Sequence, residues 1–330
     1  MTFDAKLDLP FDGPLPGPDF AEAQQWNFTD GKYGVIYHIG SMPGDLKLWH
    51  NAFAVTCPDG TALASKIIGR GPLDRFGSHS ANSITMEPYE AWEVHFDGAL
   101  RRYQPNELQL APGRDGRHIP VKVDLKISAR HPVWDPGAGS TEHEGSIFQT
   151  FCKMHHEQAL TAKGVIEIDG ERIDFEGVGH RDHSFGPREF GTLLRGFWIN
   201  GTFESGWSFL AFEGQREGSD NVRKGAIFEN GQIIECDFSH EAELHSTAPD
   251  PQTFVMKARL SDGTQRDIRV SCKNGVNWTA DGPTEWCVGS DISKPRNYVF
   301  THYFADVECD GEAGFGFADR GARADLLKHP

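Results

Sequence analysis

The sequence has no continuous run of about 20 apolar residues, the length that a membrane-spanning helix needs, so no transmembrane segment is expected. It also has no local stripe of basic residues. Its 32 lysines and arginines are outnumbered by 48 aspartates and glutamates, which gives a formal net charge of -16 and disfavours binding to nucleic-acid phosphates. Residues 1–6 lack the apolar stretch of a secretory signal, so we expect a cytoplasmic protein.

The motifs of the common cofactor enzymes are missing as well. The six cysteines form no Cys-x-x-Cys pair, which argues against a zinc ribbon or a dithiol redox site. The glycines at 311–316 have neither the order Gly-x-Gly-x-x-Gly nor a following helix, and neither a Gly-x-x-x-x-Gly-Lys-Ser/Thr loop nor a Gly-x-Ser-x-Gly elbow is present. We therefore expect no cofactor and no resident metal.

Turn signals are abundant, with 37 glycines and 19 prolines. Dipeptides such as Asp169-Gly170, Asn230-Gly231 and Asp310-Gly311 supply the positive φ angles of tight hairpins, and short alternating runs such as 121–127 read as strands. Helical periodicity is confined to short pieces near 18–26 and 151–162. The pattern predicts an all-β protein with few short helices.

The segment 131–139 interrupts the strand pattern near the middle of the chain. We place a domain boundary shortly after it, which divides the chain into residues 1–150 and 151–330. Each half has enough short strands for an antiparallel barrel or sandwich of its own.

The densest group of polar residues is 177–188, Gly-Val-Gly-His-Arg-Asp-His-Ser-Phe-Gly-Pro-Arg. Imidazoles and a carboxylate can bind zinc or iron, if an irregular loop brings His180 and His183 together. Alternatively, Asp182 is a general acid or base positioned by its neighbours. A third interpretation is a structural corner in which Arg181 or Arg188 pairs with Asp182.

Residues 177–186 resemble the Gly-x-x-Tyr-x-Asp-His-Asn-Trp-Gly signature of the carotenoid 1,2-hydratase and AttH-like family. His180, Ser184 and Phe185 depart from that signature, so this chain resembles a distant member. The resemblance implies two consecutive lipocalin-like β-barrel domains. It also implies that Asp182 protonates an alkene and that water captures the resulting cation.

The same resemblance suggests roles for three histidines. His180 stands where the family has tyrosine and would relay or orient the proton. His155 stands near the position of a family histidine upstream of the motif. For His183 we weigh a direct chemical role against a role in holding the loop.

Substrate contacts are expected from aromatic residues on strands after the motif, because aromatic faces stabilise a cation. Trp198 and Trp207 lie beside Gly201 and Gly206, where a strand can open space. Further candidates are Tyr303, Phe185 and His79, the last on a polar loop. Packing in a core, or for His79 a solvated turn, is the competing interpretation of each.

These observations favour a cofactor-independent hydratase, lyase or isomerase that transfers a proton to or from a hydrophobic small molecule such as a terpenoid, a steroid or a polycyclic aromatic. Two alternatives stay open. One is a cyclase or pericyclase of the same fold, and the other is a carrier that binds a hydrophobic ligand without changing it. The sequence leaves the oligomeric state open.

Overall fold

A computed structural model describes residues 3–104, 117–137, 154–187, 191–245, 252–281 and 285–327. The described residues form two antiparallel sheets and the short 3-10 segments η1 (Ala5–Asp8) and η3 (Ala324–Leu326). The predicted all-β class is confirmed. The pieces near 18–26 and 151–162 are not helical where they are described, because they belong to strands β1 and β9. No helix of the described residues is long and apolar enough to cross a membrane.

The first sheet closes into a barrel of eight strands in the order β4-β3-β2-β1-β10-β9-β8-β7, with β4 also paired to β7. Strands β5 and β6 extend the sheet beyond β7. Its strands are β1 (Phe20–Thr29), β2 (Gly34–Met42), β3 (Asp45–Thr56), β4 (Ala62–Arg70), β5 (Phe76–Gly77), β6 (Ala81–Glu87), β7 (Ala91–Tyr103), β8 (His118–Ala129), β9 (Met154–Ile168) and β10 (Glu171–Pro187).

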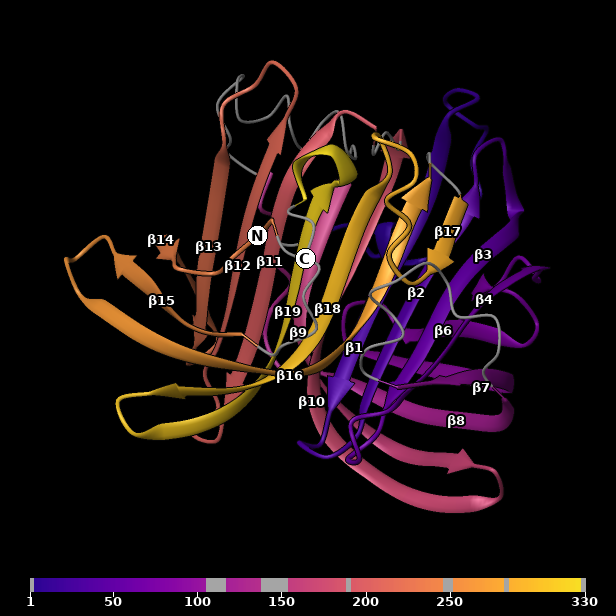
Figure 1. Cartoon of the computed structure of the whole chain (residues 1–330), viewed down its shortest axis with the longest axis horizontal. Coiled ribbons are helices and arrows are strands. Elements are labelled where there is room, and N and C mark those ends of the chain that lie inside the picture. The colour runs from indigo at the N-terminus through magenta and orange to yellow at the C-terminus, as the bar shows by residue number, and fades with distance from the viewer. Residues whose placement is uncertain are drawn as a thin grey trace.

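The second sheet closes in the order β15-β14-β13-β12-β11-β19-β18-β16, with β15 also paired to β16 and with β17 added beside β16. Its strands are β11 (Leu193–Phe203), β12 (Ser208–Arg216), β13 (Val222–Glu229), β14 (Gln232–His240), β15 (Thr253–Leu260), β16 (Gln265–Asp281), β17 (Glu285–Val288), β18 (Tyr298–Cys309) and β19 (Glu312–Arg323). In Figure 1 the first barrel lies on the right and the second on the left, with β16, β18 and β19 crossing the middle.

The change from one barrel to the other lies between β10 and β11, and not at residue 150. Strands β9 and β10 pair with β8 and β1, so they complete the first barrel. The turn predicted at Asp169-Gly170 is confirmed. Asp169 and Gly170, between β9 and β10, have φ angles of 52° and 86°, as a tight hairpin requires.

Side chains that alternate along the strands form three large apolar clusters among the described residues. One fills the first barrel and includes Trp26 and Phe53, and another fills the second barrel and includes Phe209. A third lies between the barrels, where Ala54 and other small residues of the first barrel meet Trp278 and other rings of the second. Small side chains on one wall allow the two sheets to approach closely.

A buried ion pair fastens the N-terminal segment to the first barrel. Asp8 is fully buried, and its Oδ1 lies 2.6 Å from Nη1 of Arg181, which is also fully buried. Its Oδ2 accepts hydrogen bonds from the backbone N–H of Tyr89 and the indole N–H of Trp92. Burial alone would raise the pKa of Asp8, but Arg181 and the neighbouring His183 hold it at about 2, below the ordinary 3.8.

We expect Asp8→Asn to lower the free energy of unfolding by about 3 kcal/mol at neutral pH, because it leaves a buried guanidinium without its carboxylate. The folded-state pKa is depressed, so this contribution is present above pH 4 and is lost as the pH falls towards 2. The difference in free energy of unfolding between the native protein and Asp8→Asn should therefore shrink by about 1 kcal/mol between pH 6 and pH 3. Urea unfolding at both pH values measures it, with the exposed Asp19→Asn as control. A difference in free energy of unfolding that does not change with pH would contradict a stabilising role for the charge of Asp8.

Candidate active site

Strand β10 presents different chemistry on its two faces. Arg181 and His183 point into the first barrel, where Arg181 lies over the ring of Trp92 and His183 packs edge-on against Phe76. Asp182, between them, points out of that barrel and lines a cavity shared with the second barrel. Because side chains alternate along a strand, Arg181 and His183 lie inside the first barrel, whereas Asp182 faces the second barrel.

The cavity between the barrels has a volume of about 120 Å³. Residues from both barrels line it. They are Ala23, Gln25, His38, His155, Glu157 and Asp182 from the first, and Leu193, Gly196, Phe197, Trp198, Phe212, Gly214, Trp286, Tyr298, Phe300, Asp319 and Gly321 from the second. The first barrel therefore supplies most of the polar groups, and the second supplies an aromatic wall.

Glu157 is the centre of the polar side. Its carboxylate is almost fully buried, and its Oε1 accepts a hydrogen bond of 3.0 Å from the indole N–H of Trp198. The Nε2 atom of His155 lies 3.0 Å from the same oxygen, and Nε2 of His180 lies 2.9 Å from Oε2. A buried carboxylate needs such partners, because without them its desolvation would be too costly.

Asp182 lies beside this centre and is the more accessible carboxylate. Its side chain is 26% exposed, against 1% for Glu157. Its Oδ2 lies 3.6 Å from Nε2 of His155, and its Oδ1 accepts a hydrogen bond of 3.4 Å from the hydroxyl of Ser184. His155 thus lies between the two carboxylates, and Asp182 is the one that can meet a ligand in the cavity.

The opposite wall consists of stacked rings. His38 of the first barrel stacks on Trp286 at a centroid distance of 4.3 Å, and Trp286 stacks on Phe300 at 4.9 Å. Tyr298 packs at 4.6 Å from Phe300. Burial, together with Asp319, raises the pKa of Tyr298 well above 10, so its phenol stays protonated. This wall offers a ligand several aromatic faces.

The wall depends on a glycine. A Cβ atom built on Gly321 would lie 2.3 Å from Cε1 of Tyr298, which is closer than real contacts allow. Any larger residue at position 321 would push the ring of Tyr298 out of its place against β19.

The structure brings four of the sequence-predicted site residues together. Asp182, His155 and Trp198 line the cavity. His180 lies directly behind them, in contact with Glu157 and edge-on to Trp198.

The other five predicted site residues lie elsewhere. His183 is fully buried inside the first barrel, with Nε2 at 3.0 Å from Oε1 of Glu22. Burial alone would lower the pKa of His183, but hydrogen bonds to Asp8 and Glu22 and the charges of these two carboxylates raise it above the ordinary 6.5.

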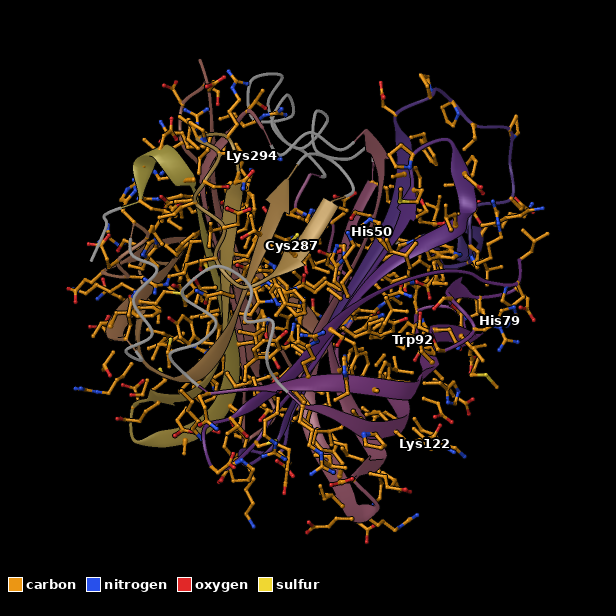
Figure 2. All side chains as sticks on the ribbon, turned by 45° about the vertical axis from the view of Figure 1, so that its right-hand side comes forward. His50, His79, Trp92, Lys122, Cys287 and Lys294 are labelled. Carbon is orange, nitrogen blue, oxygen red and sulfur yellow. The ribbon has the colours of Figure 1, made fainter. Side chains whose placement is uncertain are left out.

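Trp207 and Tyr303 belong to the interior cluster of the second barrel, so for them the competing interpretation as core residues is correct. Phe185 packs against Phe11 and Phe20, and His79 is an exposed residue at the outer edge of the first barrel in Figure 2. None of these residues lines the cavity between the barrels.

Sequence reasoning missed Glu157, His38, Trp286 and Phe300. For Glu157 a signal existed. It lies two residues after His155, as Asp182 lies two after His180, and the hairpin places Glu157 directly opposite Asp182. Pairing the strands outward from the turn at Asp169-Gly170 leads to the same register. The aromatic residues come from distant segments and carry no comparable local signal.

One group of the described residues has atoms suited to a metal ion. Ligand atoms of His155, Glu157 and Asp182 all lie within 4.8 Å of one another. However, the carboxylate of Glu157 already accepts a hydrogen bond from the indole N–H of Trp198, and it lies 3.0 Å from Nε2 of His155 and 2.9 Å from Nε2 of His180. As described, the arrangement is a hydrogen-bonded acid–base cluster, which can hold and move a proton.

The comparisons with known proteins agree with this architecture, which is that of two consecutive lipocalin-like barrels. A family model matches residues 14–320, so the chain belongs to the family described as "Domain of unknown function (DUF7064)". None of the curated proteins matches the chain.

Three solved structures share the fold across most of both chains. A candidate AttH protein from Nitrosomonas europaea has 12% identity and a TM-score of 0.58, over 91% of each chain. CghA with Sch210972 has 10% identity and a TM-score of 0.57, over 94% of this chain and 90% of that one. Kievitone hydratase from Nectria haematococca has 9% identity and a TM-score of 0.53, over 93% and 90%. At these identities the likeness establishes the fold.

We expect Glu157→Gln to lower the free energy of unfolding by about 1–3 kcal/mol, because the amide has one acceptor oxygen and brings its own donor towards the surrounding N–H groups. Urea unfolding measures the change. Glu167→Gln, an exposed position on the same strand, is the matched control and should change stability by less than about 0.5 kcal/mol. Equal stability of both variants would show that the three contacts do not depend on the carboxylate.

Proposed function

We propose that this protein is an enzyme that adds water to, or removes it from, a hydrophobic small molecule held between its two barrels. The observation that carries the proposal is the position of Asp182. It is a partly accessible carboxylate at the polar side of a cavity whose other side is aromatic. A solved structure that shares the fold is named a hydratase, which supports the same class of reaction.

In the direction of hydration, Asp182 donates its proton to one carbon of a carbon–carbon double bond. The other carbon becomes a cation, a water molecule adds to it, and the proton lost by that water restores the acid. In the reverse direction the carboxylic acid of Asp182 protonates the hydroxyl, which leaves as water, and the resulting carboxylate then removes a proton from the carbon next to the cation, which restores the acid. The rings of Trp286, Phe300 and Trp198 face the developing charge, and each such face stabilises a cation by ~0.5–2 kcal/mol.

The neighbours of Asp182 position it. His155 lies 3.6 Å from its Oδ2, and Glu157 fixes His155 in turn. His180 takes a supporting role, because it is buried behind Glu157 and is not part of the cavity lining. A general acid held in this way typically contributes ~10²–10⁴-fold to the rate.

The size of the cavity bears on the substrate. An engineered protein cavity of about 150 Å³ holds one benzene molecule. A volume of about 120 Å³ thus fits one ring or one branched alkene unit. We infer that the reacting group occupies this space and that the rest of a larger terpenoid, steroid or polycyclic substrate lies outside it. Cyclisation or isomerisation started by the same proton is the competing reaction of this site.

Asp182→Asn should reduce turnover by at least ~100-fold and leave stability unchanged, because the amide keeps the shape but cannot donate an acidic proton. The assay is mass spectrometry of hydrophobic alkenes and alcohols incubated with the protein in isotopically labelled water. Asp174→Asn, on the same strand with a side chain 88% exposed, is the matched control. Full activity of Asp182→Asn removes this mechanism, and binding of an unchanged ligand by both variants favours a carrier.

Removal of metal ions should leave turnover unchanged, since Asp182, His155 and Glu157 perform the proposed proton transfer without one. Dialysis against a chelator, elemental analysis and repetition of the assay test this point. Loss of activity that zinc, iron or manganese restores would instead assign the three side chains to a metal.

A further inference from the structure

Among the described residues, the second barrel contributes one charged side chain to the cavity between the barrels, and the reaction proposed above does not use it. This residue is Asp319 of β19. In the sheet it lies directly opposite Trp198 of β11 on one side and His302 of β18 on the other. Residues directly opposite each other in antiparallel strands project from the same face, so Asp319 stands between Trp198, which also lines the cavity, and His302.

The carboxylate of Asp319 lacks the donors that a largely buried carboxylate needs. Its side chain is 16% exposed, and its Oδ1 is buried and accepts no hydrogen bond from the described residues. Its Oδ2 lies 3.5 Å from Nε2 of His302, and this nitrogen is also buried without a hydrogen-bond partner. Glu157, by contrast, has three nitrogen atoms within 3.0 Å of its oxygens. Asp319 is therefore short of hydrogen-bond donors, which is costly for a desolvated carboxylate.

The wall behind Asp319 is aromatic. The rings of Phe300 and Phe317 pack edge-on against His302, at centroid distances of 6.1 and 5.3 Å, and His302 itself is 1% exposed. Because Oδ1 of Asp319 is buried, the accessible part of its carboxylate is at Oδ2. A donor for this oxygen has to come from the cavity.

The chemistry of a carboxylate limits what that donor can be. A carboxylate only accepts hydrogen bonds, so the ligand must offer an O–H or N–H group. The proposed reaction has such a group, because either a water molecule or the hydroxyl of an alcohol must occupy the cavity. Asp182 belongs to the first barrel and Asp319 to the second, so a ligand between the barrels meets one accessible carboxylate from each. A mainly apolar cavity with a few placed polar groups is typical of a small-molecule site.

We propose that Asp319 is the hydroxyl-binding residue of this site, and that the site takes neutral alcohols with a compact, branched carbon skeleton. In hydration, Oδ2 of Asp319 accepts a hydrogen bond from the water that adds to the cation. In dehydration it accepts one from the hydroxyl that Asp182 protonates. Asp319 itself gains no proton in either direction. The choice of a hydroxyl group rests on the proposed function, whereas the binding of an alcohol at Asp319 does not require turnover.

The test compares the binding of 2-methyl-2-butanol with that of 2-methyl-2-butene, the alkene of the same carbon skeleton, to the full chain with ¹⁵N-labelled tryptophan. NMR follows the indole N–H signals of Trp198 and Trp286, which both line the cavity, and Trp198→Phe and Trp286→Phe assign them. We expect the alcohol to move these signals in a saturable way. In Asp319→Leu the Kd of the alcohol should rise roughly tenfold or more, the effect of one hydrogen bond to a charged group, while the Kd of the alkene should not rise.

Two further variants make the comparison specific. Asp319→Asn keeps the shape of the side chain but not its charge, so it should raise the Kd of the alcohol by roughly three- to tenfold. Asp267→Leu is the matched control, because Asp267 is exposed on the same barrel and does not line the cavity, and it should leave both affinities unchanged.

Three results would overturn the proposal. One is an alcohol that does not move the signals of Trp198 and Trp286, and another is a Kd of the alcohol that is the same in the native protein and in both Asp319 variants. The third is binding of 2-methylbutan-2-amine at least tenfold tighter than that of the alcohol, which would make this a site for cations.

Failure of the proposed function gives a different result. Turnover that survives Asp182→Asn removes the reaction but leaves the selective loss of alcohol binding in the Asp319 variants in place. Conversely, unchanged alcohol binding in these variants removes the hydroxyl site and leaves turnover that depends on Asp182 in place.

Discussion

Strands β9 and β10 bury one face in the first barrel and the other against the second barrel. The structure depends on the buried charged side chains of each face finding partners. Towards the first barrel, Arg181 is paired with Asp8. Towards the second barrel, Glu157 accepts a hydrogen bond from the indole N–H of Trp198 of that barrel and lies close to Nε2 of His155 and of His180. Because each carboxylate is buried, each must have its partners before the sheets can pack. The same hairpin thus attaches the N-terminal segment and fixes where the second barrel lies.

Between the barrels, the indole N–H of Trp198 is already bound to Glu157, and the carboxylate of Asp182 stays partly accessible, an arrangement suited to proton transfer. Residues that are distant in the sequence form this site, which brings two carboxylates and a histidine together.

Local patterns predicted the strands and several turns, because a dipeptide such as Asp169-Gly170 determines its own backbone conformation. They also led to Asp182, His180 and Trp198, since chemistry-bearing side chains in or near a motif are visible in the sequence, and the family resemblance led to His155. The division at residue 150 was wrong because closure of an eight-stranded barrel is a global requirement that no local pattern states. Tyr303 was misplaced because a one-residue step along β18 decides between core and cavity, and Trp207 lies in the turn before β12, where strand alternation gives no guide.

The pairing of β1 with β10 has a consequence for how the chain reaches its native state. Phe20 lies opposite Pro187, so the first barrel closes only after most of the sequence between them has been synthesised and folded. Contacts between such distant residues carry a large loop-closure entropy and form late. On the ribosome, β1 therefore waits with one unpaired edge until the β9–β10 hairpin emerges. A fragment that ends before this hairpin keeps an open sheet, with apolar side chains exposed to association with other chains.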